Sequence, residues 1–432
     1  MKKIDLKVLD NQYKLHKFED IEMYKKFLPG YIIFEVKREF SFDGKKYEKG
    51  KKYLTVYGIF RKLVEDIENE VKKLNENNNN KFLNLKPEDF IFVPDRNFKN
   101  YFKRYNGQDL TNKKICVIKN GGYGDLIFLL PVLQYIKKNF ENVTIDFYIN
   151  NNKTDIISIF PQIFNKVGFL PIEMRDFEKY DYHYFTMYSL EHAEFSKKMN
   201  AYEIMRDIAG LKFNIEDYRP ELHVFPKLYE TFKKMLPDNM VVITVRASTD
   251  NRTLSWGVGV ELINRLISKG YTVGILDSQD FSGPISSFIK SNFGEGNYNT
   301  IVWNLAEYSQ DIAHATALIR CAKAFLGTDS GNVNIASTFK DLPTYGIYTA
   351  FKGETRISVF SNTRFYNVCN HWNKCELAPC FFHGEETGYF CPYVKKHGYS
   401  GCTDTDAVDC EYIVEDFHKF VRDFYNKEQI KE

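Results

Sequence analysis

The pattern of hydrophobic and polar positions changes along the chain. Between Tyr31 and Val56 apolar and polar residues alternate around the pair Asp43-Gly44, which is typical of a hairpin with a tight turn. A charged stretch with helical spacing follows from Ile59 to Leu74, and the asparagine run Asn77–Asn80 has the composition of a linker. Residues 1–110 are therefore predicted to form a small α+β module with its linker.

From Lys114 onward the pattern repeats a short apolar strand, a polar loop and a helix, as α/β domains do. In residues 111–230 we expect strands at Ile115–Ile118, Val143–Ile149 and Tyr182–Met187, and helices at Leu126–Lys138 and Ala201–Leu211. The stretch Pro220–Pro237 is expected to connect this part of the chain to the next.

The same rhythm resumes in residues 231–355. The expected strands are Met240–Val245, Tyr271–Asp277, Thr300–Asn304, Ala324–Gly327 and, as the last, Thr344–Ile347, and the expected helices are Val258–Ser268, Ile312–Cys321 and Asn332–Thr338. Residues 356–432 form a cysteine-rich segment with a closing helix from Val414 to Tyr425. The sequence thus predicts an α/β protein with two Rossmann-like domains and a cleft between them.

Composition and charge narrow the function classes. The chain has 432 residues, of which 44% are hydrophobic and 27% charged, as in ordinary globular proteins of two or three domains. The net charge of +2 gives no overall attraction to nucleic acid or to anionic membranes. A basic cluster in the N-terminal module fits either a solvated face or a polyanion contact; it comprises Lys45, Lys46, Lys49, Lys51 and Lys52.

The distribution of apolar residues bears on location. The N-terminal stretch MKKIDLKVLDNQYK lacks an apolar core of signal-peptide length, and the longest apolar run, Leu126–Leu133, is too short to span a bilayer. We therefore expect a cytoplasmic protein without a transmembrane segment. Thiols remain reduced in that compartment, so clustered cysteines favour a metal over disulfides.

A glycine-rich loop joins the first strand of residues 111–230 to its helix, with the sequence Asn120, Gly121, Gly122, Tyr123, Gly124 and Asp125. A dinucleotide fingerprint would need a third glycine near Ile127 and an acidic residue where Ile149-Asn150 stand, and both are missing. Two interpretations remain open. Asp125 either caps a tight turn as the N-cap residue, or it is a general base at the mouth of the cleft that deprotonates a hydroxyl group.

A second polar loop joins strand to helix in residues 231–355. It contains the candidate ligand-binding residues Asp329, Ser330, Gly331, Asn332 and Asn334. Such a turn, together with the N–H groups of the following helix, suits a pyrophosphate, and a simple capped turn is the alternative.

Three further sites lie at strand ends in the same part of the chain. Thr244, Arg246 and Arg252 follow the first strand, where arginines offer charge-assisted hydrogen bonds to phosphate. Asp277 follows the second strand, where a carboxylate suits ribose or sugar hydroxyls. Ligands of open α/β sheets bind beyond the carboxyl ends of the strands, so these sites are expected to line one cleft.

Six of the eight cysteines lie near the C-terminus. Cys375, Cys380, Cys391 and Cys402 have the loose spacing of a thiolate knuckle, which suits a structural zinc or iron ion, with Cys369 and Cys410 as alternates. Free buried thiols and disulfides remain the alternatives. Cys116 and Cys321 are expected to be packed thiols within their strand and helix.

From Lys113 to Phe424 the chain resembles glycosyltransferase family 9, the ADP-heptose:lipopolysaccharide heptosyltransferases. The resemblance is carried by GGYGDLIFLLPVLQYIKK (Gly121–Lys138) and LGTDSGNVNIAS (Leu326–Ser337). It implies a GT-B fold, an inverting mechanism and a nucleotide-activated sugar. It also implies that Asp125 is the catalytic base and that Asp329, Ser330 and Gly331 form the donor diphosphate loop.

The chain departs from the family pattern at several positions. Arg252 stands where the family has lysine, Asn334 where it has histidine, and Leu254-Ser255 where it has Trp-Pro. The module of residues 1–110 lies outside the resemblance, and its Asp-Gly-Lys hairpin resembles those of phage-encoded proteins, which would place the protein in a host cytoplasm. Some family members carry a comparable cysteine-rich finger.

The expected function is that of an inverting glycosyltransferase. It would move a sugar from a nucleotide-diphosphate sugar, ADP-heptose-like or another, to a hydroxyl group of a glycan, a protein or a modified DNA base. No acidic pair calls for a catalytic divalent ion. The alternatives are a non-catalytic protein of the same fold that binds sugar nucleotides, and a nucleic-acid-binding protein that uses the basic module.

Overall fold

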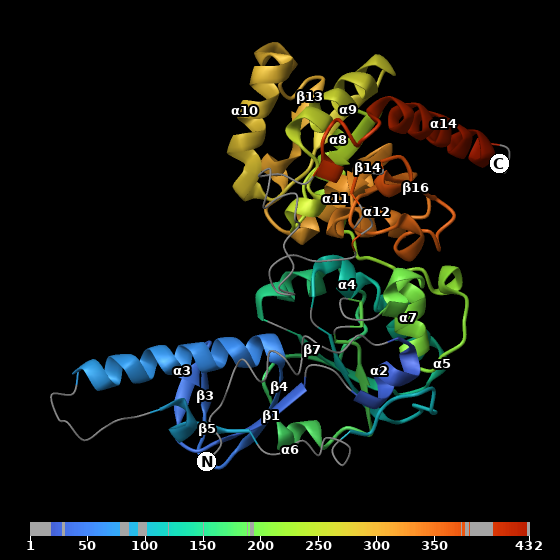
Figure 1. Ribbon diagram of the computed structural model, residues 1–432. Helices are drawn as coiled ribbons and strands as arrows, with labels where there is room; N and C mark the ends of the chain where they lie inside the picture. Colours follow the sequence, from blue (N-terminus) through green and yellow to red (C-terminus); the bar gives the residue numbers. More distant parts are fainter. Residues whose placement is uncertain are drawn as a thin grey trace.

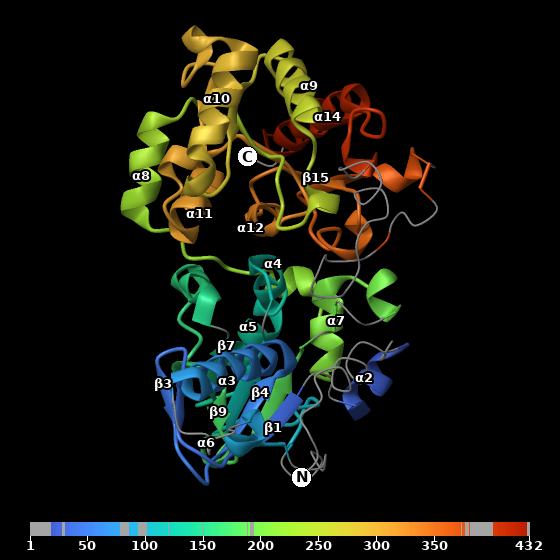
Figure 2. The same cartoon turned by 60° about the vertical axis from the view of Figure 1, so that its left-hand side comes forward.

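The structure of the chain is a computed structural model, which describes residues 19–27, 31–77, 86–93, 102–119, 121–149, 151–187, 189–190, 194–372, 374–375, 380 and 401–429. Two parallel-sheet units lie one above the other, and the N-terminal module lies beside the lower one (Figures 1 and 2). None of the described helices combines the length and the apolar content needed to cross a membrane.

The N-terminal module is a helix packed on an antiparallel sheet. Its elements are α2 (Ile21–Phe27), β1 (Tyr31–Val36), β2 (Phe40–Phe42), β3 (Lys45–Tyr47), β4 (Lys52–Val56), α3 (Tyr57–Asn77) and β5 (Ile91–Phe92). The predicted turn is confirmed, because Asp43 and Gly44 have positive φ angles of 49° and 72° and join β2 to β3. The apolar face of α3, which includes Phe60, Leu63 and Ile67, packs on aromatic residues of the strands.

The sheet of this module is completed by the neighbouring unit. Its strand order is β5-β1-β4-β9, and β9 (Ile172–Glu173) comes from far along the chain. A shared apolar core continues this connection, since Tyr31 and Leu54 of the module pack with Ile118 and Phe185 of the next sheet. The N-terminal module is therefore firmly attached to the unit that follows it.

The first parallel unit has the strand order β10-β6-β7-β8. Its elements are β6 (Lys114–Ile118), α4 (Tyr123–Ile127), α5 (Leu130–Asn139), β7 (Thr144–Ile149), β8 (Lys166–Phe169), α6 (Met174–Phe177), β10 (Tyr182–Phe185) and α7 (Ala201–Ile208). The expectation of a single helix from Leu126 to Lys138 was wrong in one respect, because two helices, α4 and α5, divide this stretch at Phe128-Leu129. Pro131 has no N–H group to donate to a preceding turn, so a new helix begins beside it.

The second parallel unit has the strand order β13-β12-β11-β14-β15-β16, which is the 3-2-1-4-5-6 order of a Rossmann fold. Its elements are α8 (Pro226–Met235), β11 (Met240–Thr244), α9 (Trp256–Ser268), β12 (Thr272–Ile275), α10 (Ser282–Phe293), β13 (Val302–Asn304), α11 (Ile312–Cys321), β14 (Ala324–Thr328), α12 (Gly331–Thr338), β15 (Thr344–Tyr348), β16 (Thr363–Asn367) and α14 (Cys410–Gln429).

Two expectations for this unit were wrong. The stretch Pro220–Pro237 is not only a connection, because it contains α8, which packs against α11. Thr344–Ile347 is not the last strand either, because β16 follows and pairs in parallel with β15. The sequence of β16 carries the exposed Arg364 and only two apolar residues, so it shows no apolar run.

Candidate functional site

The polar loops singled out in the sequence leave each sheet where the strand order reverses. In the first sheet this point lies between β6 and β10, and the loop that follows β6 is the glycine-rich one. In the second sheet it lies between β11 and β14, whose following loops hold Arg252 and Asp329. Crevices at such points are where open α/β sheets bind their ligands.

Asp125 is held against its own loop. It is the third residue of α4, and its Oδ2 accepts a hydrogen bond of 2.8 Å from the backbone N–H of Gly122. The N-cap residue is Gly122, so the interpretation of Asp125 as the N-cap was wrong. Gly121 has a φ of +146°, and a Cβ there would lie 2.5 Å from the Asp125 Oδ2, so the loop needs glycine beside this carboxylate. Asn120 lies outside the described residues.

Tyr123 fixes the other side of the same loop. Its hydroxyl donates a 2.5 Å hydrogen bond to Oδ2 of Asp155. Burial, followed by the hydrogen bond to Asp155, raises the pKa of Tyr123 above its ordinary value, so the phenol stays protonated. Its side chain also lies against the second unit, since a Cβ on Gly331 would be 3.1 Å from the Tyr123 Cβ.

Arg252 supports the loop that follows β14. Its Nη1 donates to the backbone carbonyl of Asp329 at 3.2 Å and lies 3.5 Å from that residue's carboxylate. Its Nε and Nη2 donate to the hydroxyl groups of Thr249 and Ser248. The Arg252 guanidinium is thus largely occupied within the protein, and it fixes the position of the Asp329 turn.

Arg246 and Asp277 form a second ion pair, with the Arg246 Nε 3.1 Å from the Asp277 Oδ2. The guanidinium carbon also lies 3.7 Å from the centre of the Phe281 ring. Burial raises the pKa of Asp277, and the hydrogen bond from the Ser278 N–H and the Arg246 charge act in the opposite direction. At the end of β11, Thr244 Oγ1 accepts a 3.4 Å hydrogen bond from Asn332 Nδ2.

Three buried polar atoms of the loop after β14 and the first turn of α12 have no hydrogen-bond partner among the described residues. They are Oδ2 of Asp329, Oγ of Ser330 and Oδ1 of Asn334. Ser330 is the N-cap residue of α12, yet its side chain makes no capping bond, so a simple capped turn does not account for it. Buried polar atoms without partners are rare in proteins and are typical of places that a ligand or water completes.

The two candidate loops meet at the junction of the units. A Cβ on Gly124 would lie only 2.5 Å from Nδ2 of Asn334, which itself donates to the Ser330 carbonyl at 3.0 Å. Both views show α4 and α12 facing each other at this junction (Figures 1 and 2). The catalytic candidate and the diphosphate-loop candidate are therefore brought together from opposite units.

Two buried basic residues beside these loops were not singled out in the sequence. Lys119 is fully buried at the end of β6, and its Nζ lies 3.4 Å from the carbonyl of Thr186 after β10. Arg356 follows β15 and is 3% exposed. A single basic residue in a loop has no periodic or spacing signal, so only the fold reveals that it is buried.

The cysteine prediction is only partly covered by the structure. Cys391 lies outside the described residues, and among those described no group of three or more potential ligands gathers. Cys375 and Cys402 pack against the core of the second unit, whereas Cys380 lies 3.7 Å from Asn251 Nδ2. The remaining described thiols, all free, are Cys116, Cys321, Cys369 and Cys410, of which Cys116, Cys321 and Cys410 are buried. The metal site thus stays a prediction.

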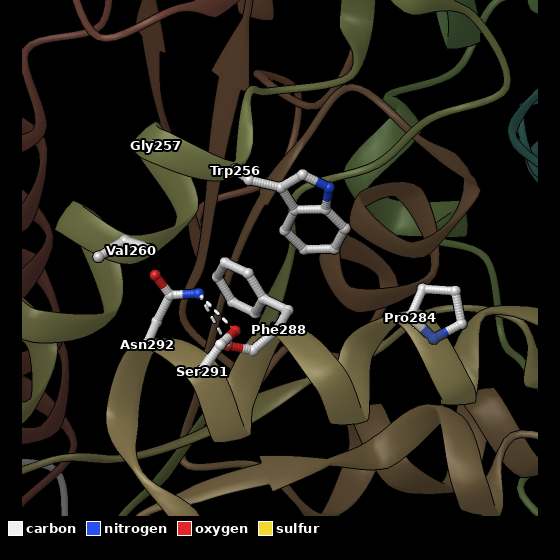
Figure 3. A pocket seen from close by; sticks show the side chains of 7 residues that line it. All are labelled: Trp256, Gly257, Val260, Pro284, Phe288, Ser291 and Asn292. Atoms are coloured by element: carbon white, nitrogen blue, oxygen red, sulfur yellow. Dashed lines mark hydrogen bonds between the residues drawn. The ribbon is translucent and has the colours of Figure 1, made fainter.

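A cavity of about 380 Å³ opens between α9 and α10, away from the predicted site residues. It is largely apolar, and Figure 3 shows the Trp256 indole beside the Phe288 ring, with Val260 and Pro284 on either side. The two ring centres are 4.4 Å apart. No described residue of the Asp125 loop or of the Asp329 loop lines this cavity.

No protein-family model and no curated protein matches the chain. Solved structures do. A glycosyl transferase of family 9 from Veillonella parvula matches 74% of this chain and 100% of its own, with 10% identity and a TM-score of 0.54. The iron-containing dodecameric glycosyltransferase TibC of enterotoxigenic E. coli matches 94% of both chains, with 14% identity and a TM-score of 0.47.

The E. coli ADP-heptose lipopolysaccharide heptosyltransferase II matches 59% of this chain and 90% of its own, with 17% identity and a TM-score of 0.47. The Veillonella likeness confirms the expected fold, two Rossmann-like units of the GT-B kind.

Proposed function

We propose that the protein is a glycosyltransferase that uses a nucleotide-diphosphate sugar. The observation that carries this is the contact of Gly124 with Asn334, which places the loop of Asp125 against the loop of Asp329. One unit supplies a carboxylate, and the other supplies buried polar atoms and the amide end of α12. A sugar held between them would meet a base on one side and an anion-binding turn on the other.

In the proposed reaction Asp125 takes the proton of an acceptor hydroxyl, and the oxygen attacks the anomeric carbon of the donor. The bond from that carbon to the diphosphate breaks, and the nucleotide diphosphate leaves with the electron pair, which inverts the anomeric centre. Asp125 accepts only one backbone hydrogen bond among those assigned to the described residues, so its other oxygen remains available to a substrate.

The donor would lie over the end of β11 and β14. The amide groups at the start of α12 and the side chains of Ser330 and Asn334 suit the diphosphate, whereas Asp277 suits ribose hydroxyls. The resemblance of Gly121–Lys138 and Leu326–Ser337 to glycosyltransferase family 9 makes an ADP-heptose-like sugar the first donor to test. The acceptor is a hydroxyl of a glycan, a protein or a modified DNA base, and the site is proposed to lie in the cytoplasm.

The test separates binding from chemistry. Thermal shifts with ADP-, UDP-, GDP- and CDP-sugars identify the donor, since a ligand that binds the native state stabilises it. With that donor, Asp125→Asn should keep the thermal shift but lose at least about 100-fold in turnover. The matched control is Asp181→Asn, a carboxylate of the same unit that also accepts a backbone hydrogen bond, from Lys114 at the start of β6, and this variant should stay within about threefold of the wild-type rate. Wild-type turnover in Asp125→Asn would refute the proposal, and binding without turnover in the wild type would favour the non-catalytic alternative.

A further inference from the structure

The arginines beside the candidate diphosphate site differ in whether a carboxylate already neutralises their charge. Arg246 is paired with Asp277, and Arg252 is paired with Asp329. Arg356 has no carboxylate within ion-pair distance among the described residues, although it is 3% exposed. A buried charge without a counter-ion is costly, so its retention calls for an explanation.

The guanidinium of Arg356 is supported by neutral groups. Its Nη1 donates to the carbonyl of Thr355 at 3.0 Å, and its central carbon lies 4.1 Å from the Phe351 ring centre. The Phe128 ring of the first unit lies 6.0 Å away, three residues beyond Asp125. These contacts orient the cation without neutralising it.

Arg356 also lies within electrostatic reach of both candidate loops. Burial lowers the pKa of Arg356, and the charges of Asp329 and then Asp125 act in the opposite direction. Tyr348, whose buried hydroxyl has no hydrogen-bond partner among the described residues, is close enough to raise that pKa as well. Arg356 therefore lies in the neighbourhood of the Asp329 turn, where the side-chain oxygens of Ser330 and Asn334 have no hydrogen-bond partner among the described residues.

We infer that Arg356 is the cation that binds the diphosphate of the donor, an inference that rests on the proposed function. Because Arg356 belongs to the second unit and Phe128 to the first, part of its burial comes from the contact between the units. Parting the units exposes the guanidinium, a diphosphate then supplies the missing counter-charge, and closure buries the pair. Arg246 and Arg252 act mainly by holding the strand-end loops in place.

The experiment uses inorganic pyrophosphate as the probe and the full chain. Arg356→Gln should raise the pyrophosphate Kd at least about tenfold, because it removes the charge from a buried pair. Arg356→Lys should recover part of this loss. The matched control is Arg219→Gln, since Arg219 also lies on an aromatic ring, that of Phe360 at 4.5 Å, but already has Glu216 as its partner. Wild-type affinity in Arg356→Gln would overturn the inference.

A second measurement does not depend on the folding of a variant. In the wild-type protein, pyrophosphate should slow amide hydrogen exchange in residues 353–358, and unchanged exchange there would overturn the inference. The experiments distinguish a failure of the Arg356 inference from a failure of the proposed function. If Asp125→Asn abolishes turnover while Arg356→Gln binds pyrophosphate normally, only the role of Arg356 is refuted. If pyrophosphate binding needs Arg356 but no nucleotide sugar is consumed, the anion site stands and the proposed function falls.

Discussion

Asn334 and Gly124 meet across the junction of the two units, and the space between them has no room for a side chain at position 124. A Cβ on Gly124 would lie 2.5 Å from the side-chain nitrogen Nδ2 of Asn334. Nothing in the backbone forces glycine here, because Gly124 lies inside α4 without a positive φ. The requirement comes from the opposite unit. The pair therefore reports on how closely the units approach each other.

Gly124→Ala should separate activity from stability. Alanine favours a helix over glycine by about 1 kcal/mol, which offsets the cost of displacing the Asn334 side chain, so the free energy of unfolding should change little. Turnover should fall about tenfold or more, because the two loops are pushed apart. The control is Gly259→Ala, another glycine inside a helix, where an added Cβ would have its nearest contacts at an ordinary 3.8 Å. Equal activity of the two variants, measured with the same donor, would contradict the close-approach argument.

Asn200 links the two units through its side-chain amide. It donates to the carbonyl groups of Glu354 and Arg356 at 3.0 and 2.9 Å, and its Oδ1 caps α7 by accepting from the Tyr202 N–H. Asn200→Ala should lower the free energy of unfolding, measured in urea, by about 2–3 kcal/mol. The variant leaves the carbonyl groups of Glu354 and Arg356 without this hydrogen-bond donor, and it removes the cap of α7.

The matched control for this variant is Asn214→Ala. Asn214 also caps a short helical turn, by accepting from the Glu216 N–H at 3.3 Å, but it makes no side-chain hydrogen bond to the described residues of the second unit. Its loss should cost about 1 kcal/mol or less. Hydrogen exchange in residues 353–358 should rise in Asn200→Ala and not in Asn214→Ala, and the same exchange in both would show that Asn200 acts only as a cap.

His183 makes the stability of the protein depend on pH. Its Nδ1 accepts from the Lys103 N–H and its Nε2 donates to the Phe177 carbonyl, so the buried ring is neutral. Burial lowers the pKa of His183 from 6.5 to about 4. The unfolded chain therefore binds the proton more readily, and the stability present at pH 7 is lost as the pH falls from 6.5 toward 4, on the order of 3 kcal/mol.

The measurement is urea unfolding at several pH values between 7 and 4. His183→Gln keeps an amide donor and acceptor, so it should flatten this part of the profile, whereas His223→Gln, at an exposed position, should leave the profile unchanged. An unaltered slope in His183→Gln would show that other groups cause the loss of stability in acid.

Local patterns in the sequence suffice for much of the fold. The runs Ile115–Ile118 and Met240–Ile243 are recognisable because buried parallel strands are apolar on both faces. The break before Pro131 and the strand Thr363–Asn367 were missed, since the first depends on one residue within a continuous helical pattern and the second on pairing with β15.

The residues of the candidate site also differ in whether the sequence alone reveals them. Asp125 and Asp329 stand in strand-loop-helix contexts that a sequence reveals, and the structure brings their loops together. Arg356 could not be singled out, because its meaning arises from neighbours that are distant in the chain, such as Phe128. The ion pair of Arg246 with Asp277 depends likewise on β11 and β12 lying side by side. Sequence patterns locate the loops of the site. The tertiary structure is needed to show which charged residues pair with one another.

The pairing of Tyr53 with Glu173 has a mechanical consequence. A strand lent by one unit to the sheet of another removes the hinge that a simple tether would leave. The orientation of the N-terminal module relative to the first parallel unit is therefore set by main-chain pairing and by a shared apolar core, rather than by the length of a linker.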